Sequence, residues 1–162
     1  SGVLAGVIMG VVLSLGWLVY VSSTPEAPVL GREPGSQAFR DIEHHADAET
    51  YPGLLVLRFD GGLFFASADA FTDRLRELAE DADPPYDTVV ISFEGVDFID
   101  SQGSSTIGEI VALTRSYGAD IRLARVKPSV LDVLRRDGVI DTLGEDHIYG
   151  NLYEAVADRI EP

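Results

Sequence analysis

The sequence predicts an α/β domain, a mostly parallel or mixed β-sheet with packed α-helices, preceded by a transmembrane helix. Short apolar runs of the kind that buried strands use alternate along the chain with segments of helical periodicity. The order strand, helix, strand, helix, strand implies right-handed crossovers and therefore a mostly parallel sheet. An uncharged apolar segment precedes this pattern, and the remaining length suits one domain of about 125 residues.

The N-terminal segment is long and apolar enough to cross a bilayer. Residues 3–21 include no charge, and a helix of that length covers about 28 Å, close to the thickness of the hydrocarbon core. Trp17 and Tyr20 lie where interfacial aromatic residues are expected, and two overlapping GxxxG spacings over residues 2–10 would let a second helix approach closely. A signal peptide is the disfavoured alternative because a basic n-region is missing, and the start at Ser1 suggests a fragment of a longer protein.

A short linker is expected after the membrane span, which we assign to residues 1–24. The stretch SSTPEAPVLGREPGS contains three prolines and two glycines, which disfavour a regular helix. We therefore assign residues 25–36 to the linker and residues 37–162 to the soluble domain. Arg32 and Arg40 lie close to the span and favour a cytoplasmic position for that domain.

Five apolar runs in the soluble domain are predicted to be strands. They are residues 38–42, 54–59, 63–66, 88–93 and 121–126. The second and fourth are nearly continuous apolar runs, as expected for strands that are covered on both faces.

Four segments between and after these runs have helical periodicity. They are a helix capped by Ser67 that ends at the DPP of residues 83–85, a helix with Ile107, Ile110, Val111 and Thr114 on one face that stops near Gly118, a helix from Pro128 that stops before Gly138, and a last helix that starts at Asn151. Asn151 and Glu154 have capping-box spacing, and Leu152, Ala155 and Val156 are expected to be buried.

Composition and missing motifs exclude several functional classes. The formal charge of -15 would repel nucleic acids, and the absence of cysteine removes disulfides and thiolate chemistry. The three histidines, His44, His45 and His147, form no recognisable catalytic triad or metal-binding spacing. The chain also lacks a G-x-S-x-G elbow, a P-loop and a G-x-G-x-x-G fingerprint. We therefore expect neither a metal site nor an enzymatic activity.

The stretch VDFIDSQGSST, residues 96–106, joins a strand to a helix and is the main candidate site. Unpaired N–H groups at a helix N-terminus attract ligands, so a site is expected at this junction. Asp100 or Ser101 could cap the helix, and capping is the favoured intrinsic role of Ser101. A phosphate on Ser101 would face the positive helix end but crowd the neighbouring aspartates, which would alter this surface sharply.

A basic segment stands out in this acidic chain. Six cations and two carboxylates lie within 22 residues, and the cations are Arg115, Arg122, Arg125, Lys127, Arg135 and Arg136. The segment could hold an anion or an acidic partner. The favoured alternative is a solvated face whose arginines neutralise neighbouring carboxylates.

Several segments in this order resemble a known family. GLLVLRFDGGLFFASADAF, DTVVISFEGVDFIDSQGSSTIGEI, ADIRLARVKPSVLDVLRRDGV and DHIYGNLYEAV together resemble the STAS domain, the sulfate transporter and anti-sigma-factor antagonist domain. The apolar span, the LGREPGSQAFRDIEHHADAETYPG connector and LFFASADAF resemble the end of a SulP-family anion transporter. The resemblance implies a cytoplasmic regulatory domain that follows the last transmembrane helix of a carrier in the cell membrane, with the anion pathway in the membrane domain.

The resemblance also implies a role for the candidate loop. In anti-sigma antagonists a partner kinase phosphorylates the serine directly after the loop aspartate, and Ser101 and Gly103 match the motif, whereas Gln102 and Ser104 differ from its usual small and apolar residues. A stand-alone antagonist switched at Ser101 is therefore the alternative function. Family members are also proposed to bind guanine nucleotides near this loop, although no cofactor is required. The resemblance therefore implies a candidate ligand loop of Asp100, Ser101, Gln102, Gly103 and Ser104, with Arg122, Arg125 and Lys127 as the candidate anion-facing residues.

The same resemblance sets the expected partners. They are the membrane domain of the same transporter, a nucleotide, a regulatory protein or kinase, and a second copy in a homodimer that forms through the full transporter. No nucleic acid is expected, because of the acidic charge.

Overall fold

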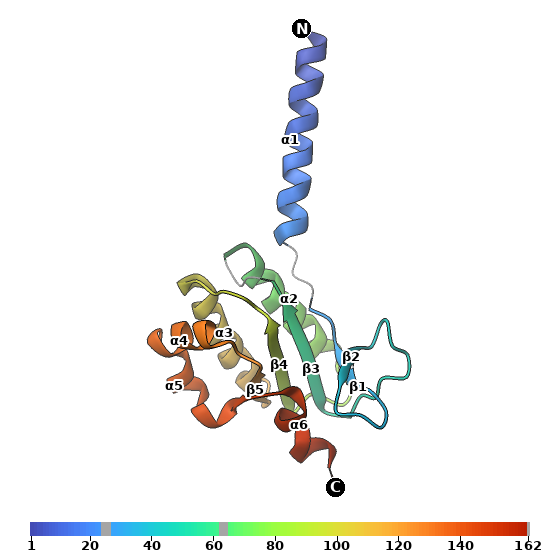
Figure 1. Ribbon diagram of the computed structural model, residues 1–162, viewed down its shortest axis with the longest axis vertical. Helices are drawn as coiled ribbons and strands as arrows, with labels where there is room; N and C mark the ends of the chain where they lie inside the picture. The colour runs from blue at the N-terminus through green and yellow to red at the C-terminus, as the bar shows by residue number, and fades with distance from the viewer. Residues whose placement is uncertain (24–26, 62–64, 162) are drawn as a thin grey trace.

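The computed structural model describes residues 1–23, 27–61 and 65–161. Helix α1 (Gly2–Ser23) projects from an α/β domain (Figure 1). Among the described residues, one helix is long and apolar enough to cross a membrane, since Gly2–Val21 has a mean hydropathy of 2.3 and is not buried within the chain. A helix that is apolar on every side requires lipid or other helices around it.

The domain is built on a four-stranded sheet in which all neighbouring strands are parallel, in the order β3-β4-β5-β6. Its strands are β3 (Leu54–Asp60), β4 (Thr88–Gly95), β5 (Asp120–Ala124) and β6 (Ile148–Tyr149). The predicted fold class, a mostly parallel sheet with packed helices, is confirmed. β3 and β4 are almost wholly buried because both of their faces are covered, which explains their continuous apolar sequences.

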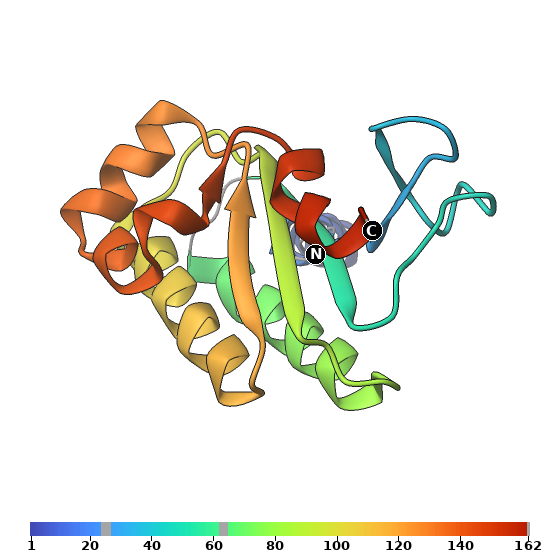
Figure 2. The same ribbon diagram turned by 90° about the horizontal axis from the view of Figure 1, so that it is seen from below.

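Helices cover the two faces of the sheet unequally (Figure 2). One face packs against α2 (Phe65–Asp81), α3 (Ser101–Ser116), α4 (Pro128–Arg136) and α5 (Val139–Leu143). The other face packs against α6 (Leu152–Ile160) and a small antiparallel sheet of β1 (Leu30–Arg32) and β2 (Phe39–Asp41). A 3₁₀ turn, η1 (Glu145–His147), precedes β6.

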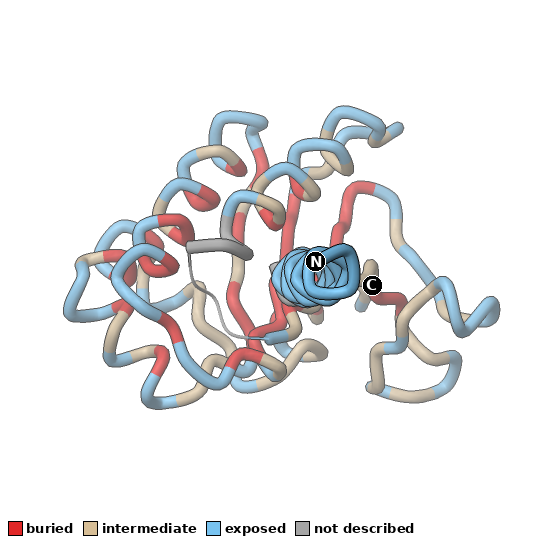
Figure 3. Tube along the Cα trace, turned by 90° about the horizontal axis from the view of Figure 1, so that it is seen from above, coloured by how far each residue is buried: buried red, intermediate tan, exposed pale blue. Residues whose placement is uncertain are grey.

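Each face of the sheet has its own apolar core. Leu57, Ile91 and Leu123 point to the larger core under α2 to α5, whereas Val56 and Val90 point to the smaller core under α6. Successive residues of a strand face opposite sides, so adjacent positions serve different cores. In Figure 3 the buried residues follow the strands and the inner sides of the helices, whereas α1 is exposed along its length.

The prediction of a strand over residues 63–66 is wrong where the structure describes it. Residues 62–64 lie outside the described ranges, but Phe65 and Ala66 belong to α2, and Ser67 lies inside that helix instead of capping it. β3 and β4 are direct neighbours, so the sheet has no place for a strand between them. Such a short apolar run does not distinguish a strand from a helix.

The segment expected to be a linker contains β1. Val29 forms an antiparallel bridge to Leu57, Arg58 donates its N–H to the carbonyl of Pro28 over 3.2 Å, and Leu30 is 4% exposed. Proline opposes helix formation but tolerates a short strand at a sheet edge, which the sequence pattern did not reveal. The predicted strand at 38–42 is β2, and it pairs with β1 outside the main sheet. The domain boundary at residue 37 stays a prediction.

The C-terminal third matches the prediction in its helices and differs in its short elements. Asn151 Oδ1 accepts the N–H of Glu154 over 2.9 Å, which confirms the predicted cap of α6. Ala155 and Val156 are buried, and Leu152 is half-buried. The elements α5, η1 and β6 were not predicted, because two to five residues are too few to show a periodicity.

Arg122 fastens α6 to the sheet. Its guanidinium donates to Asp158 through two bonds of 2.5 and 2.9 Å, to the carbonyl of Ala155 over 2.7 Å and to Asp120 over 3.0 Å. The hydrogen bonds from Arg122 lower the pKa of Asp158. The Arg122 side chain is 11% exposed, so its charge is held between the sheet and the helix.

Asp100 caps α3, and the expectation that Ser101 does so is wrong. Asp100 has extended backbone angles, and its Oδ1 accepts the N–H of Gly103 over 2.7 Å. Ser101 is already the first residue of α3 and is exposed. A carboxylate at this position also interacts favourably with the positive end of the helix.

Replacement of Asp100 by alanine should lower the free energy of unfolding by about 1 kcal/mol, because the N–H of Gly103 loses its partner. The matched variant Ser101→Ala should change it by less than about 0.5 kcal/mol. Urea unfolding of the full chain in nanodiscs, followed by circular dichroism, measures both values. A larger loss for Ser101→Ala than for Asp100→Ala would show that the cap is assigned to the wrong residue.

Candidate functional site

The candidate loop lies on the side of the domain that carries α1. The carboxyl ends of β3, β4 and β5 and the N-terminal ends of α2 and α3 all meet there (Figure 1). We call this surface the α1-side edge and define it as residues 58–61, 94–104 and 125–127. In open parallel sheets, ligands and partners bind at such an edge, where loops join strands to helices.

The loop after β4 is held in place by two buried apolar side chains and one close backbone approach. Val96 is fully buried and Ile99 is 7% exposed, so both face the core. A Cβ atom at Gly95 would overlap with the Oδ1 atom of Asp60 and lie 3.1 Å from the carbonyl oxygen of Phe59, so a larger residue would force Asp60 to move. Between the two buried positions, Phe98 is directed outward and is 55% exposed.

Three ion pairs cross the α1-side edge. Arg58 pairs with Asp60 over 2.9 Å, Arg125 pairs with Glu94 over 2.8 Å, and Lys127 pairs with Asp97. An anion that bound to Arg125 or Lys127 would therefore compete with a carboxylate that is already in contact. The assignment of these two residues to an anion site stays a prediction, as does guanine nucleotide binding.

The remaining predicted cation of the site, Arg122, lies elsewhere. It is directed toward α6 on the opposite face of the sheet from α3, where Asp120 and Asp158 surround it. Three further cations of the basic segment also have protein partners. Arg115 donates to the carbonyls of Thr142 and Leu143, Arg135 to Glu145, and Arg136 to Asp137. The structure thus favours the interpretation in which these cations neutralise or bind neighbouring groups.

The five residues of the candidate ligand loop divide into two groups. Ser101 and Gln102 are exposed and accessible to a partner, and Asp100 is occupied as the helix cap. Gly103 and Ser104 are buried under the first turn of α3. The Ser104 hydroxyl is buried and has no hydrogen-bond partner among the described residues. It occupies a position that suits an apolar side chain better than a ligand-binding one.

The histidines have local partners. The ring of His44 bonds to Asp41, and the ring of His147 lies 3.0 Å from both Asp120 and Asp146. Within the part of the chain that the structure describes, no group of three or more potential ligand residues could hold a metal ion.

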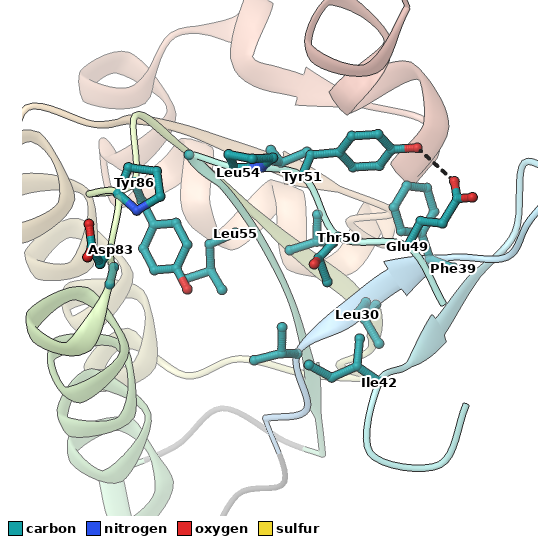
Figure 4. Close-up of a pocket in the computed structure, with 16 residues that line it drawn as sticks. Leu30, Phe39, Ile42, Glu49, Thr50, Tyr51, Leu54, Leu55, Asp83 and Tyr86 are labelled. Carbon is teal, nitrogen blue, oxygen red and sulfur yellow. Dashed lines mark hydrogen bonds between the residues drawn. The ribbon is translucent and has the colours of Figure 1, made fainter. Parts of the chain in front are cut away.

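A cavity of about 410 Å³ lies at the other end of β3 (Figure 4). Its walls come from β1, β2, the segment before β3, the start of β3 and the segment that follows α2, so no local motif reveals it. Tyr51 donates to Glu49 over 3.4 Å on one wall, and on the other wall burial raises the pKa of Tyr86. The cavity is lined by none of the residues of the candidate loop.

Two relatives are similar over almost the whole chain, including α1. A probable sulfate transporter 4.2 of Arabidopsis thaliana is 27% identical over 96% of this chain and 24% of its own length. A probable sulfate transporter of Mycobacterium tuberculosis is 31% identical over 96% of this chain and 28% of its own length. The chain thus spans about a quarter of the length of these relatives.

Two solved structures share the fold. The murine Solute Carrier 26 family member A9 anion transporter in the inward-facing state superposes with a TM-score of 0.79, is 18% identical, and is matched over 95% of this chain and 25% of that one. The STAS domain of a SulP transporter from Vibrio cholerae superposes with a TM-score of 0.58, is 20% identical, and is matched over 72% of this chain and 88% of that one. At these identities the similarity shows the fold alone.

A family model for the STAS domain matches residues 45–157, which extends from the segment before β3 to α6. The match includes all four strands of the parallel sheet and the candidate loop. This chain therefore belongs to the STAS domain family.

Proposed function

We propose that this chain is the cytoplasmic regulatory STAS domain of a SulP-type transporter for sulfate or another inorganic anion, with α1 as the C-terminal part of its last transmembrane helix. One observation carries the proposal. The similarity to sulfate transporters extends over 96% of the chain, so it includes the apolar helix and the domain in the same order. A shared domain alone would not account for the helix.

The anion pathway belongs to the membrane domain in this proposal. The part of the chain beyond α1 is acidic, since it contains all 27 carboxylates and all 12 lysines and arginines, and Arg125 and Lys127 are already paired with carboxylates. The positively charged Arg32 and Arg40 close to the span support a cytoplasmic position. The domain would then act on transport through contact with the membrane domain.

The alternative, a stand-alone anti-sigma antagonist, is less well supported. Such a protein works in solution and has no use for an exposed apolar helix that is joined to the domain by three residues. Phosphorylation of Ser101, as in that family, is proposed here as a way to regulate the transporter. Ser101 is exposed at the first position of α3, beside the ion pair of Asp97 with Lys127.

Removal of residues 37–162 from the intact carrier should change sulfate uptake by about fivefold or more, because coupling between a regulatory domain and its target is worth about 1–3 kcal/mol. Uptake into vesicles with matched amounts of carrier in the membrane measures this effect. Equal uptake with and without the domain would contradict the proposed function.

The substitution Ser101→Glu in the intact carrier should change uptake in the same direction as phosphorylation, because it adds a negative charge beside Asp97 and Asp100. Ser105→Glu is the matched control, since Ser105 is also exposed on α3 but lies one turn further along the helix. Uptake that is unchanged for Ser101→Glu, or changed equally in both variants, would argue against a switch at Ser101.

A further inference from the structure

Phe98 is an exposed aromatic residue at a defined position of the fold. Among the described side chains beyond α1, the exposed large hydrophobic ones are Phe98, which is 55% exposed, and Tyr117, which is 44% exposed. Phe98 precedes α3 on the α1-side edge, whereas Tyr117 caps the opposite end of that helix. A helix of 16 residues is about 24 Å long, so the two rings mark opposite ends of the domain.

The backbone around Phe98 is fixed before any partner binds. Val96 and Ile99 are buried on either side of it, Asp97 is paired with Lys127, and Asp100 caps α3. The ring is therefore presented outward from an ordered loop, and binding would cost little conformational entropy. Rigid aromatic residues of this kind are enriched among the few residues that dominate binding energy at protein interfaces.

The connection to α1 keeps this edge close to the membrane boundary. Residues 24–26 alone separate Ser23, at the end of α1, from Ala27. Four Cα–Cα steps span at most about 15 Å. The next residue, Pro28, already bonds to Arg58 on the α1-side edge. The end of α1 and this edge are thus held within a short distance of each other.

The negative charge of the domain makes a basic protein loop a more favourable partner for the Phe98 surface than anionic lipid headgroups. A chain with a formal charge of -15 is repelled by anionic lipid headgroups. Asp97 and Asp100 lie in the Phe98 loop, and Glu94 precedes it. Lys127 and Arg125 pair with Asp97 and Glu94, but the α1-side edge has four carboxylates and three cations and so stays slightly acidic. The cytoplasmic loops of membrane proteins, in contrast, are rich in Lys and Arg. A Lys or Arg side chain can bind to such a surface in two ways, by a cation–π contact with the Phe98 ring and by an ion pair with a neighbouring carboxylate.

We infer that Phe98 anchors the domain on a Lys- or Arg-containing cytoplasmic loop of the membrane domain of the same transporter. The inference rests on the proposed function and adds to it the surface and the residue that make the contact. Ser101 lies three residues from Phe98 at the margin of this surface, so a phosphate there would add negative charge beside the docked loop.

Photo-crosslinking tests the inference in the intact carrier. The crosslinking amino acid p-benzoylphenylalanine replaces Phe98 in one variant and Tyr117 in the control, and both substitutions keep an aromatic ring at an exposed position. After irradiation in membranes, position 98 should yield crosslinks to a Lys- or Arg-containing cytoplasmic loop, several-fold more often than position 117. Equal yields at the two positions, or no crosslink from position 98 to the membrane domain, would overturn the inference.

A second crosslinking experiment distinguishes a protein partner from the lipid bilayer. It uses the 162-residue chain in phosphatidylserine-containing nanodiscs, where α1 and lipid are present but the other transmembrane helices of the carrier are not. Position 98 should give no more lipid adducts than position 102, where the same amino acid replaces the exposed Gln102 on the same edge. A clear excess of lipid adducts at position 98 would show that Phe98 contacts the bilayer, which contradicts the inference.

The failure of the inference can be distinguished from the failure of the proposed function. If the domain deletion changes uptake but position 98 does not crosslink, the docking surface is wrong and the proposed function stands. If the deletion leaves uptake unchanged, the proposed function itself fails.

Discussion

The connection between α1 and the sheet limits every arrangement that the domain can adopt beneath a membrane. Three residues join Ser23 to Ala27, and Pro28 and Val29 are already bound to β3. A tether of this length allows limited rotation but does not allow the domain to diffuse away or to turn its opposite end toward α1. The strands run toward α1, so their carboxyl ends, the start of α3 and Phe98 all lie at the constrained edge.

The ion pairs on the α1-side edge contribute little to the stability of the fold and mainly determine which charges a ligand or partner would meet there. Its three ion pairs have side chains that are about a third to four-fifths exposed, and pairs of this kind contribute roughly 0–1 kcal/mol each to stability. They hold Arg125 and Lys127 against Glu94 and Asp97, and Ser101 is exposed on the same edge. A phosphate, a nucleotide or a basic loop would each have to compete for the same small set of charges. Inputs at Ser101 and contacts through Phe98 would therefore influence one another.

The sequence predicted the elements whose patterns are long or chemically specific. The apolar runs of β3 and β4, the periodicity of α3 and the Asn151 cap of α6 all depend on neighbouring residues, and each was confirmed. The prediction was wrong for Ser67 and for the strand at 63–66, where a short apolar run gave no sign of the helix that contains Phe65.

The sequence did not reveal which groups the candidate site residues bind, because those groups come from segments that are distant in sequence. Arg122 was a candidate anion-facing residue, and the carboxylate that it binds, Asp158, comes from α6, 36 residues further along the chain. β1 is only three residues long and lies between Pro28 and Pro34, and its position is determined by bonds of this segment to β2 and β3. The loop itself was located correctly, whereas the division between exposed Ser101 and buried Ser104 required the fold.

Lengthening the tether is the most direct test of this account. A flexible Gly/Ser insertion of about ten residues between Ser23 and Ala27 would release the α1-side edge from the membrane boundary and leave the domain folded. The same insertion at Gly35, in an exposed turn between β1 and β2, is the control because it leaves the connection from α1 to β3 unchanged. The account predicts that the tether insertion alone makes sulfate uptake resemble that of the carrier without its domain. Wild-type uptake with the lengthened tether would contradict it.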